Sequence, residues 1–213
     1  KKLNGKIIYT HTPEVAQRKS EPWIRILQYK NLSGNFSNSK FTDLNGELGL
    51  SNGEPMERAT ALYHLDASDL HWMIEEDSKD ALLVLQEGLD FTSGSVLINY
   101  RFEENPEKPE TEKEWGKIEL KNLAMKYHDR LQAMTRLNGN ISYDDEKIRL
   151  ENVMGRYGDS SLHLEGEIDR RDVSNPDFSL RLNLPEFLNE DMKDIPVFSD
   201  FKFSGPAHIS MSI

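Results

Sequence analysis

The chain combines 213 residues with a formal net charge of −11 and no cysteine. A length of this order allows one large domain or two small ones. Nucleic-acid binding needs a basic surface that neutralises phosphates, so the acidic balance argues against it, and also against lying flat on an anionic bilayer. Without cysteine the chain has neither a disulfide framework nor thiolate chemistry.

The sequence contains no apolar run of about 18 residues, so it predicts no membrane-spanning helix, and its start has no secretory h-region. Lys1 begins inside a pattern, and Ile213 ends inside an apparent strand. We therefore expect a piece of a longer protein, whose anchors and signals lie outside this sequence.

The first half of the chain mixes possible helices with a clear strand. Short helices are possible at 12–20 and 78–88. Apolar residues at 96, 98, 100 and 102 alternate with Leu97, Asn99 and Arg101, which predicts a strand with one apolar face. The segment 103–114 is acidic, contains proline and lacks apolar residues, so we expect a solvated loop or linker there. Because the same strand pattern continues beyond it, we expect a single domain over 1–213.

The second half is richer in strands. The segment 122–136 fits a helix or a strand, and periodicity does not decide between them. Alternating leucines and isoleucines then predict strands up to 184 and again at 207–213, with a possible short helix at 185–192. Polar clusters at 143–146 and 155–159 are typical of hairpin turns. The chain thus predicts a mainly β, mostly antiparallel fold of about a dozen strands, with a few short helices.

A pattern of apolar-x-Gly-x-apolar recurs at irregular spacing, for example at Leu44–Leu48, Leu137–Ile141 and Leu164–Ile168. With a period of two, each glycine falls on the apolar face of its strand, where a missing side chain leaves a gap. Two explanations are open. The glycines mark bulges or bends of a twisted sheet, which is the commoner case, or they leave room for a foreign molecule.

No motif in the sequence indicates catalysis. The six histidines form no HExxH or other paired metal-ligand spacing, and there is no nucleophile elbow, P-loop or dinucleotide fingerprint. The acidic triplets at 75–77 and 144–146 lack the alternating oxygen ligands and turn glycine of a calcium loop. We expect no metal, no cofactor and no enzymatic activity.

The segment 115–187 carries the most specific order of elements. The strand 116–122 is followed by Leu137-Asn-Gly-Asn-Ile141, then by Gly155-Arg-Tyr-Gly-Asp-Ser160, and Phe178–Phe187 closes the unit. This order resembles the AsmA-like family of the Gram-negative cell envelope, whose relatives include TamB and YhdP. The resemblance is best over 115–213 and weaker over 23–50.

The resemblance implies a fold and a function. Such proteins are anchored in the inner membrane by an N-terminal helix and extend into the periplasm, where an elongated, curled antiparallel sheet forms an open trough with an apolar interior. The implied function is lipid binding or lipid transport between the membranes, or support of envelope assembly, with phospholipid or another acyl-chain lipid as the partner. Alternation assigns the lipid-contacting face to Val96, Ile98, Tyr100, Phe102, Ile141, Ile148, Leu150, Leu162, Leu164, Ile168, Leu180, Leu182, Leu184, Ile209 and Met211.

Two other classes of protein compete with this interpretation. A structural or adhesive β-sandwich would seal the apolar faces against one another, although the runs here consist of leucine, isoleucine and glycine where sandwich cores favour aromatic residues. A β-rich hydrolase acting on envelope glycans would need two carboxylates facing one cleft.

Overall fold

A computed structural model describes residues 3–9, 23–51, 54–74, 89–105, 108–127, 131–172, 175–187, 191 and 207–212. Within these residues it contains one helix, α1 (Ala67–Ile74), and the following strands. They are β1 (Leu3–Tyr9), β2 (Trp23–Phe36), β3 (Ser39–Ser51), β4 (Glu54–Asp66), β5 (Leu89–Asn105), β6 (Lys108–Tyr127), β7 (Met134–Tyr143), β8 (Lys147–Tyr157), β9 (Ser160–Asp169), β10 (Asp177–Phe187) and β11 (Ala207–Ser212).

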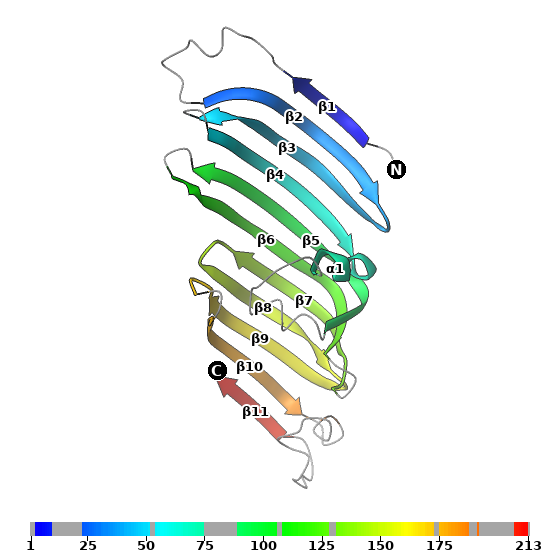
Figure 1. The fold of residues 1–213 in the computed structure, drawn as a ribbon. Coiled ribbons are helices and arrows are strands. Elements are labelled where there is room, and N and C mark those ends of the chain that lie inside the picture. The colour runs from blue at the N-terminus through cyan, green and yellow to red at the C-terminus, as the bar shows by residue number, and fades with distance from the viewer. Residues whose placement is uncertain are drawn as a thin grey trace. The chain divides into compact units, whose positions relative to one another are not determined.

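The described strands form one sheet whose spatial order follows the chain from β1 to β11 (Figure 1). The pairs whose register is defined are all antiparallel, and the sheet is not closed, because β1 and β11 stand at opposite ends of this order. The expected mainly β, antiparallel and open sheet is confirmed. The alternation of apolar and polar residues explains this sheet. Successive side chains of a strand point to opposite faces, so alternation makes one face apolar and the other polar.

The chain divides into two compact units, each made of two segments. Unit 1 consists of Lys1–His64 and Ile98–Lys117, and unit 2 of Leu65–Leu97 and Ile118–Ile213. The long strands β5 and β6 contribute to both units. In unit 1 the strands β2, β3 and β4 pair in succession, and in unit 2 the strands from β7 to β11 do so.

Several expected elements differ from the structure. The loop expected at 103–114 is wrong where it is described, because β5 continues to Asn105 and β6 begins at Lys108. Backbone pairing in a hairpin does not need apolar side chains, so an acidic sequence can continue both strands. The segment 122–136 is strand where β6 and β7 cover it, and 185–187 belongs to β10. The possible helices at 12–20 and 78–88, and most of 188–192, lie outside the described residues.

Helix α1 follows β4 directly and was not expected from the sequence. The Asp66 side chain caps its first turn, since Oδ1 accepts hydrogen bonds from the Ser68 backbone N–H at 3.0 Å and from the Ser68 hydroxyl at 2.6 Å. Leu65 is fully buried, and Ala67 and Leu70 are nearly so. The capping residue followed by buried apolar residues is the signal that could have located this helix.

Candidate functional site

Register sorts the side chains of unit 2 into two faces. Ile148 pairs with Ile168, and Ile168 with Phe178, while the neighbouring row joins Leu150, Gly166 and Leu180. Directly paired residues of antiparallel strands share a face. The apolar residues of neighbouring strands therefore meet on one surface. We call this set the apolar face of unit 2: Leu137, Ile141, Ile148, Leu150, Val153, Leu162, Leu164, Gly166, Ile168, Phe178, Leu180, Leu182 and Leu184.

Burial changes along this apolar face. At the end where β8 turns into β9, Leu137, Val153 and Leu162 are each less than a tenth exposed, and so is Tyr157 at the end of β8. At the opposite strand ends the apolar side chains are only half-buried: Ile141, Ile148, Leu150, Ile168, Phe178 and Leu180. We call the first group the Tyr157 end and the second the Ile148 end. The first behaves as a core, whereas the second leaves apolar surface in contact with solvent.

The Tyr157 end is also fixed by polar contacts. Asp191 is only 5% exposed, and its Oδ2 accepts hydrogen bonds from the Ser160 hydroxyl at 2.5 Å and from the Asp159 backbone N–H at 3.1 Å. These bonds hold the turn between β8 and β9. A buried carboxylate with such partners anchors the turn, because buried polar groups are retained where they are hydrogen-bonded.

Unit 1 carries a corresponding apolar face. Tyr29 pairs with Gly46 and Gly46 with Ala59, while Leu27 pairs with Leu48. Leu48 is 39% exposed, and on the edge strand β1 the side chains of Leu3, Ile7 and Tyr9 are more than half exposed. The half-buried members of this face are Leu27, Tyr29, Phe36, Phe41, Leu44, Tyr63, Ile98, Tyr100 and Phe102.

Five described strands interrupt the alternation at one place, with a step of three between apolar residues. The steps run from Tyr29 to Leu32, Phe41 to Leu44, Leu120 to Leu123, Met134 to Leu137 and Leu150 to Val153. In each strand the residue before the second apolar residue has a left-handed backbone, with φ between 50° and 53°: Asn31, Asp43, Asn122, Arg136 and Asn152. Each step is therefore a β-bulge, which absorbs one residue without turning the strand over.

Asparagine side chains join bulges on neighbouring strands. Asn45 Oδ1 accepts a hydrogen bond from the Asn31 backbone N–H at 2.9 Å. Asn138 Oδ1 does the same for the Asn122 backbone N–H at 3.0 Å. Both asparagines precede a glycine in a Leu-Asn-Gly sequence. The repeated asparagine therefore belongs to the backbone geometry of the sheet.

The glycines of the two apolar faces are explained by the backbone geometry and packing of the sheet, which is the commoner of the two explanations. Gly139 has a φ of +154°, and a Cβ there would lie 2.7 Å from the Val153 Cα. Gly166 has a φ of +135°, and a Cβ there would collide with the Ser179 carbonyl. Gly46 differs, because the Tyr29 ring lies over it. At these three positions a side chain would collide with backbone or with a ring, so the glycines are explained by the packing of the sheet itself.

Tyrosines and an acid interrupt the apolar face of unit 1. The Tyr29 hydroxyl reaches across Gly46 and donates a hydrogen bond to Glu57 Oε1 at 3.2 Å. The rings of Tyr63 and Tyr100 meet edge to face, with their centroids 6.2 Å apart. We call Tyr29, Glu57, Tyr63 and Tyr100 the tyrosine cluster.

The pKa values of the three phenols in the tyrosine cluster are raised. Burial and the Glu57 carboxylate raise the pKa of Tyr29 to about 12. Burial and the Glu114 carboxylate raise the pKa of Tyr100 to about 12, with smaller contributions from Tyr63, Glu57 and Tyr29. Burial also raises the pKa of Tyr63. All three phenols therefore stay neutral well above pH 7 while acidic groups lie beside them.

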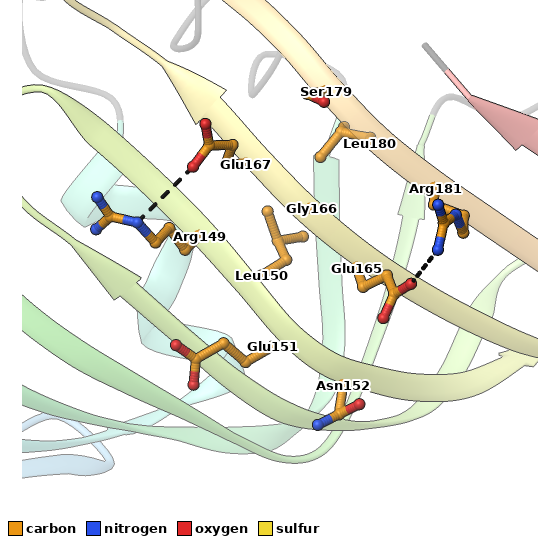
Figure 2. Close-up of a pocket in the computed structure, with 10 residues that line it drawn as sticks. All are labelled: Arg149, Leu150, Glu151, Asn152, Glu165, Gly166, Glu167, Ser179, Leu180 and Arg181. Carbon is orange, nitrogen blue, oxygen red and sulfur yellow. Dashed lines mark hydrogen bonds and ion pairs between the residues drawn. The ribbon is translucent and has the colours of Figure 1, made fainter.

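The opposite face of unit 2 is polar. Cross-strand ion pairs join Arg149 Nε to Glu167 Oε2 at 3.8 Å and Arg181 Nη1 to Glu165 Oε1 at 3.1 Å (Figure 2). These side chains surround a shallow depression of about 600 Å³, lined also by Leu150, Gly166 and Leu180. Because both of its arginines are paired with glutamates across the strands, this depression offers no concentrated positive charge to a ligand.

The structure places the predicted apolar residues as follows. Val96, Leu162 and Leu184 are buried. The half-buried ones are Ile98, Tyr100, Phe102, Ile141, Ile148, Leu150, Leu164, Ile168, Leu180 and Leu182. Ile209 and Met211 lie in β11 opposite Leu184 and Leu182, and their side chains are outside the described part. The prediction missed Tyr29, Tyr63 and Glu57, although the alternation of Glu57, Ala59, Ala61 and Tyr63 was visible in the sequence.

Among the described residues there is no group of three histidine, aspartate or glutamate side chains that could hold a metal ion, and no helix long and apolar enough to cross a membrane. Comparison with models of protein families, with curated proteins and with solved structures finds no match.

Proposed function

We propose that the chain binds acyl chains of membrane lipids along the apolar faces of its sheet, as a periplasmic segment of an AsmA-like protein that carries lipid between the envelope membranes or supports their assembly. The single observation that carries this proposal is the Ile148 end, where register brings six apolar side chains together and leaves them half-buried. Contiguous apolar surface that stays in contact with solvent often marks a binding site.

The physical driving force is the hydrophobic effect. An acyl chain laid on the face removes apolar surface from water, at roughly 25 cal/mol per Å² buried. The attraction is not directional, so a row of leucines and isoleucines selects hydrocarbon in general. The charged opposite face, with its paired arginines and glutamates, keeps such a sheet soluble.

The burial pattern favours this function over a sealed sandwich. In a sandwich both ends of the apolar face would be buried against a second sheet. Here the Tyr157 end is buried and the Ile148 end is half-buried on the same strands. Leu150 and Val153 illustrate the change within β8, since Val153 is 3% exposed and Leu150 is half-buried.

A binding experiment with variants on the two faces tests the proposal. The purified chain should bind a fluorescent fatty acid in a saturable way, and organic extracts of it should contain phospholipid. Leu180→Glu and Leu164→Glu should abolish this binding, because a charge on the face must lose its hydration when hydrocarbon covers it. Circular dichroism of both variants should remain β-rich.

The matched control is Asn183→Glu. Asn183 lies in β10, pairs with His163 and faces away from the apolar residues, so the variant adds the same charge to the same strand on the other face. It should bind the fatty acid as the unmodified chain does. Equal binding by all four proteins would place the site elsewhere and contradict the proposal.

A further inference from the structure

The tyrosine cluster introduces polar chemistry into the apolar face of unit 1. A carboxylate is unfavourable on a face that binds only hydrocarbon, because a charged group there loses part of its hydration. Glu57 nevertheless shares this face with Leu27 and Leu48, and its carboxylate accepts a hydrogen bond from the Tyr29 hydroxyl. Glu114 lies close enough to Tyr100 to raise the pKa of its phenol. The tyrosine cluster therefore combines three aromatic rings with the Glu57 carboxylate, and Glu114 adds a second negative charge near Tyr100.

This combination matches the chemistry of a cationic amine. Ring faces attract ammonium groups through their quadrupole, and aromatic residues gather around quaternary or methylated amines where proteins recognise them. A carboxylate beside the rings adds charge complementarity and accepts N–H hydrogen bonds. Half-buried tyrosines exclude part of the water that would otherwise screen both attractions.

The surroundings of the tyrosine cluster suit the rest of an amphiphile. Leu48 is 39% exposed on the same face, and Leu27, Ile98 and Phe102 are half-buried. An alkyl chain attached to the amine can lie on these side chains while the amine meets the rings and carboxylates. Charge complementarity and apolar surface thus point to one molecule.

We propose that the juxtaposition of Tyr29, Tyr63 and Tyr100 with Glu57 and Glu114 selects lipids whose head group carries an ammonium group, of the phosphatidylethanolamine class. This inference rests on the proposed acyl-chain binding and adds a head-group preference to it. An anionic head group is disfavoured at the same place, because the two carboxylates repel it and aromatic rings attract cations and not anions.

Two phospholipids with identical short acyl chains test the inference on the whole chain. Phosphatidylethanolamine and phosphatidylglycerol are each titrated against a bound fluorescent fatty acid, at concentrations below micelle formation. We expect phosphatidylethanolamine to displace the probe at about ten-fold lower concentration, the ratio that one desolvated cation–π contact with a charge partner supplies.

Variants separate the tyrosine cluster from the overall negative charge. Glu57→Gln combined with Glu114→Gln should bring the two lipids to within about two-fold of one another, a loss of most of the tenfold ratio. The glutamine amide introduced by Glu57→Gln keeps an oxygen that can accept the hydrogen bond from the Tyr29 hydroxyl, so we expect the fold to be retained. The control Glu119→Gln combined with Glu151→Gln removes the same charge from two exposed positions and should keep the full preference. The double variant Tyr63→Leu with Tyr100→Leu should also lose the preference for phosphatidylethanolamine.

The outcomes distinguish the two proposals. If both lipids displace the probe equally in the unmodified chain, the head-group preference is wrong and acyl-chain binding stands. If the control pair loses the preference as fully as the cluster pair does, net charge explains it and the cluster does not. If neither lipid nor the fatty acid binds, the proposed function itself fails.

Discussion

At the scale of single residues, the apolar face is less uniform than its pattern. Tyr29 covers Gly46 and reaches Glu57, so a glycine, an aromatic ring and an acid form one packed arrangement. Alternation predicts which face such residues occupy. It does not predict that a ring will lie across the neighbouring strand, because that depends on the register of β2 and β3 and on the side chain missing at position 46.

The shifted phenols predict a delayed alkaline titration. The pKa is raised from 10.0 to about 12 for Tyr29 and Tyr100, so the folded chain holds two protons that the unfolded chain releases. Stability should therefore be constant up to about pH 10 and fall as the pH rises from there towards 12. Ultraviolet absorbance of tyrosinate measures the titration, and thermal unfolding at each pH measures the stability.

The double variant Tyr29→Phe with Tyr100→Phe is the control for this titration. It should lose most of the late phase of the absorbance change, with Tyr63 remaining, and it should lose less stability over the same pH range. The prediction is wrong if all seven tyrosines of the unmodified chain titrate together near their ordinary pKa.

At the scale of strands and hairpins, β8, β9 and β10 each run from a half-buried end to a buried one. Ile148, Ile168 and Phe178 form the first row, and Tyr157 with Ser160 the last. The sequence shows leucine and isoleucine alternation along β9 and β10 and, as far as Leu150, along β8. Burial differs because contacts such as those of Asp191 with the β8–β9 turn come from a distant part of the chain, which alternation does not reveal.

This difference in burial predicts that the same leucine-to-alanine substitution lowers the free energy of unfolding by different amounts at the two ends. Leu162→Ala, at the buried end, should lower the free energy of unfolding by about 2–5 kcal/mol, because it leaves a cavity. Leu180→Ala, at the half-buried end, should cost about 1 kcal/mol or less, since water can reach the space. Urea unfolding followed by circular dichroism measures both. Similar losses in the two variants would show that the faces are buried alike.

At the scale of the whole molecule, the sequence predicted the class of fold well. Period-two alternation and polar turns, such as Asp144 accepting the Lys147 backbone N–H at 2.8 Å, were sufficient for an antiparallel sheet. The acidic segment 103–114 misled, because propensity weighs side chains while pairing of β5 with its neighbours involves the backbone. The positions of the buried apolar side chains were not predictable, since they depend on contacts between distant residues.

The steps of three between apolar residues also determine how the sequence can change. Deleting Asn152 would bring Leu150 and Val153 to a spacing of two, so both would still point the same way. Deleting Arg149 would instead invert every residue on one side of the gap. We expect the first variant to fold with a slightly lower melting temperature and the second to be insoluble or unfolded by circular dichroism. Insertions and deletions inherited by such a chain should accordingly concentrate at its bulges.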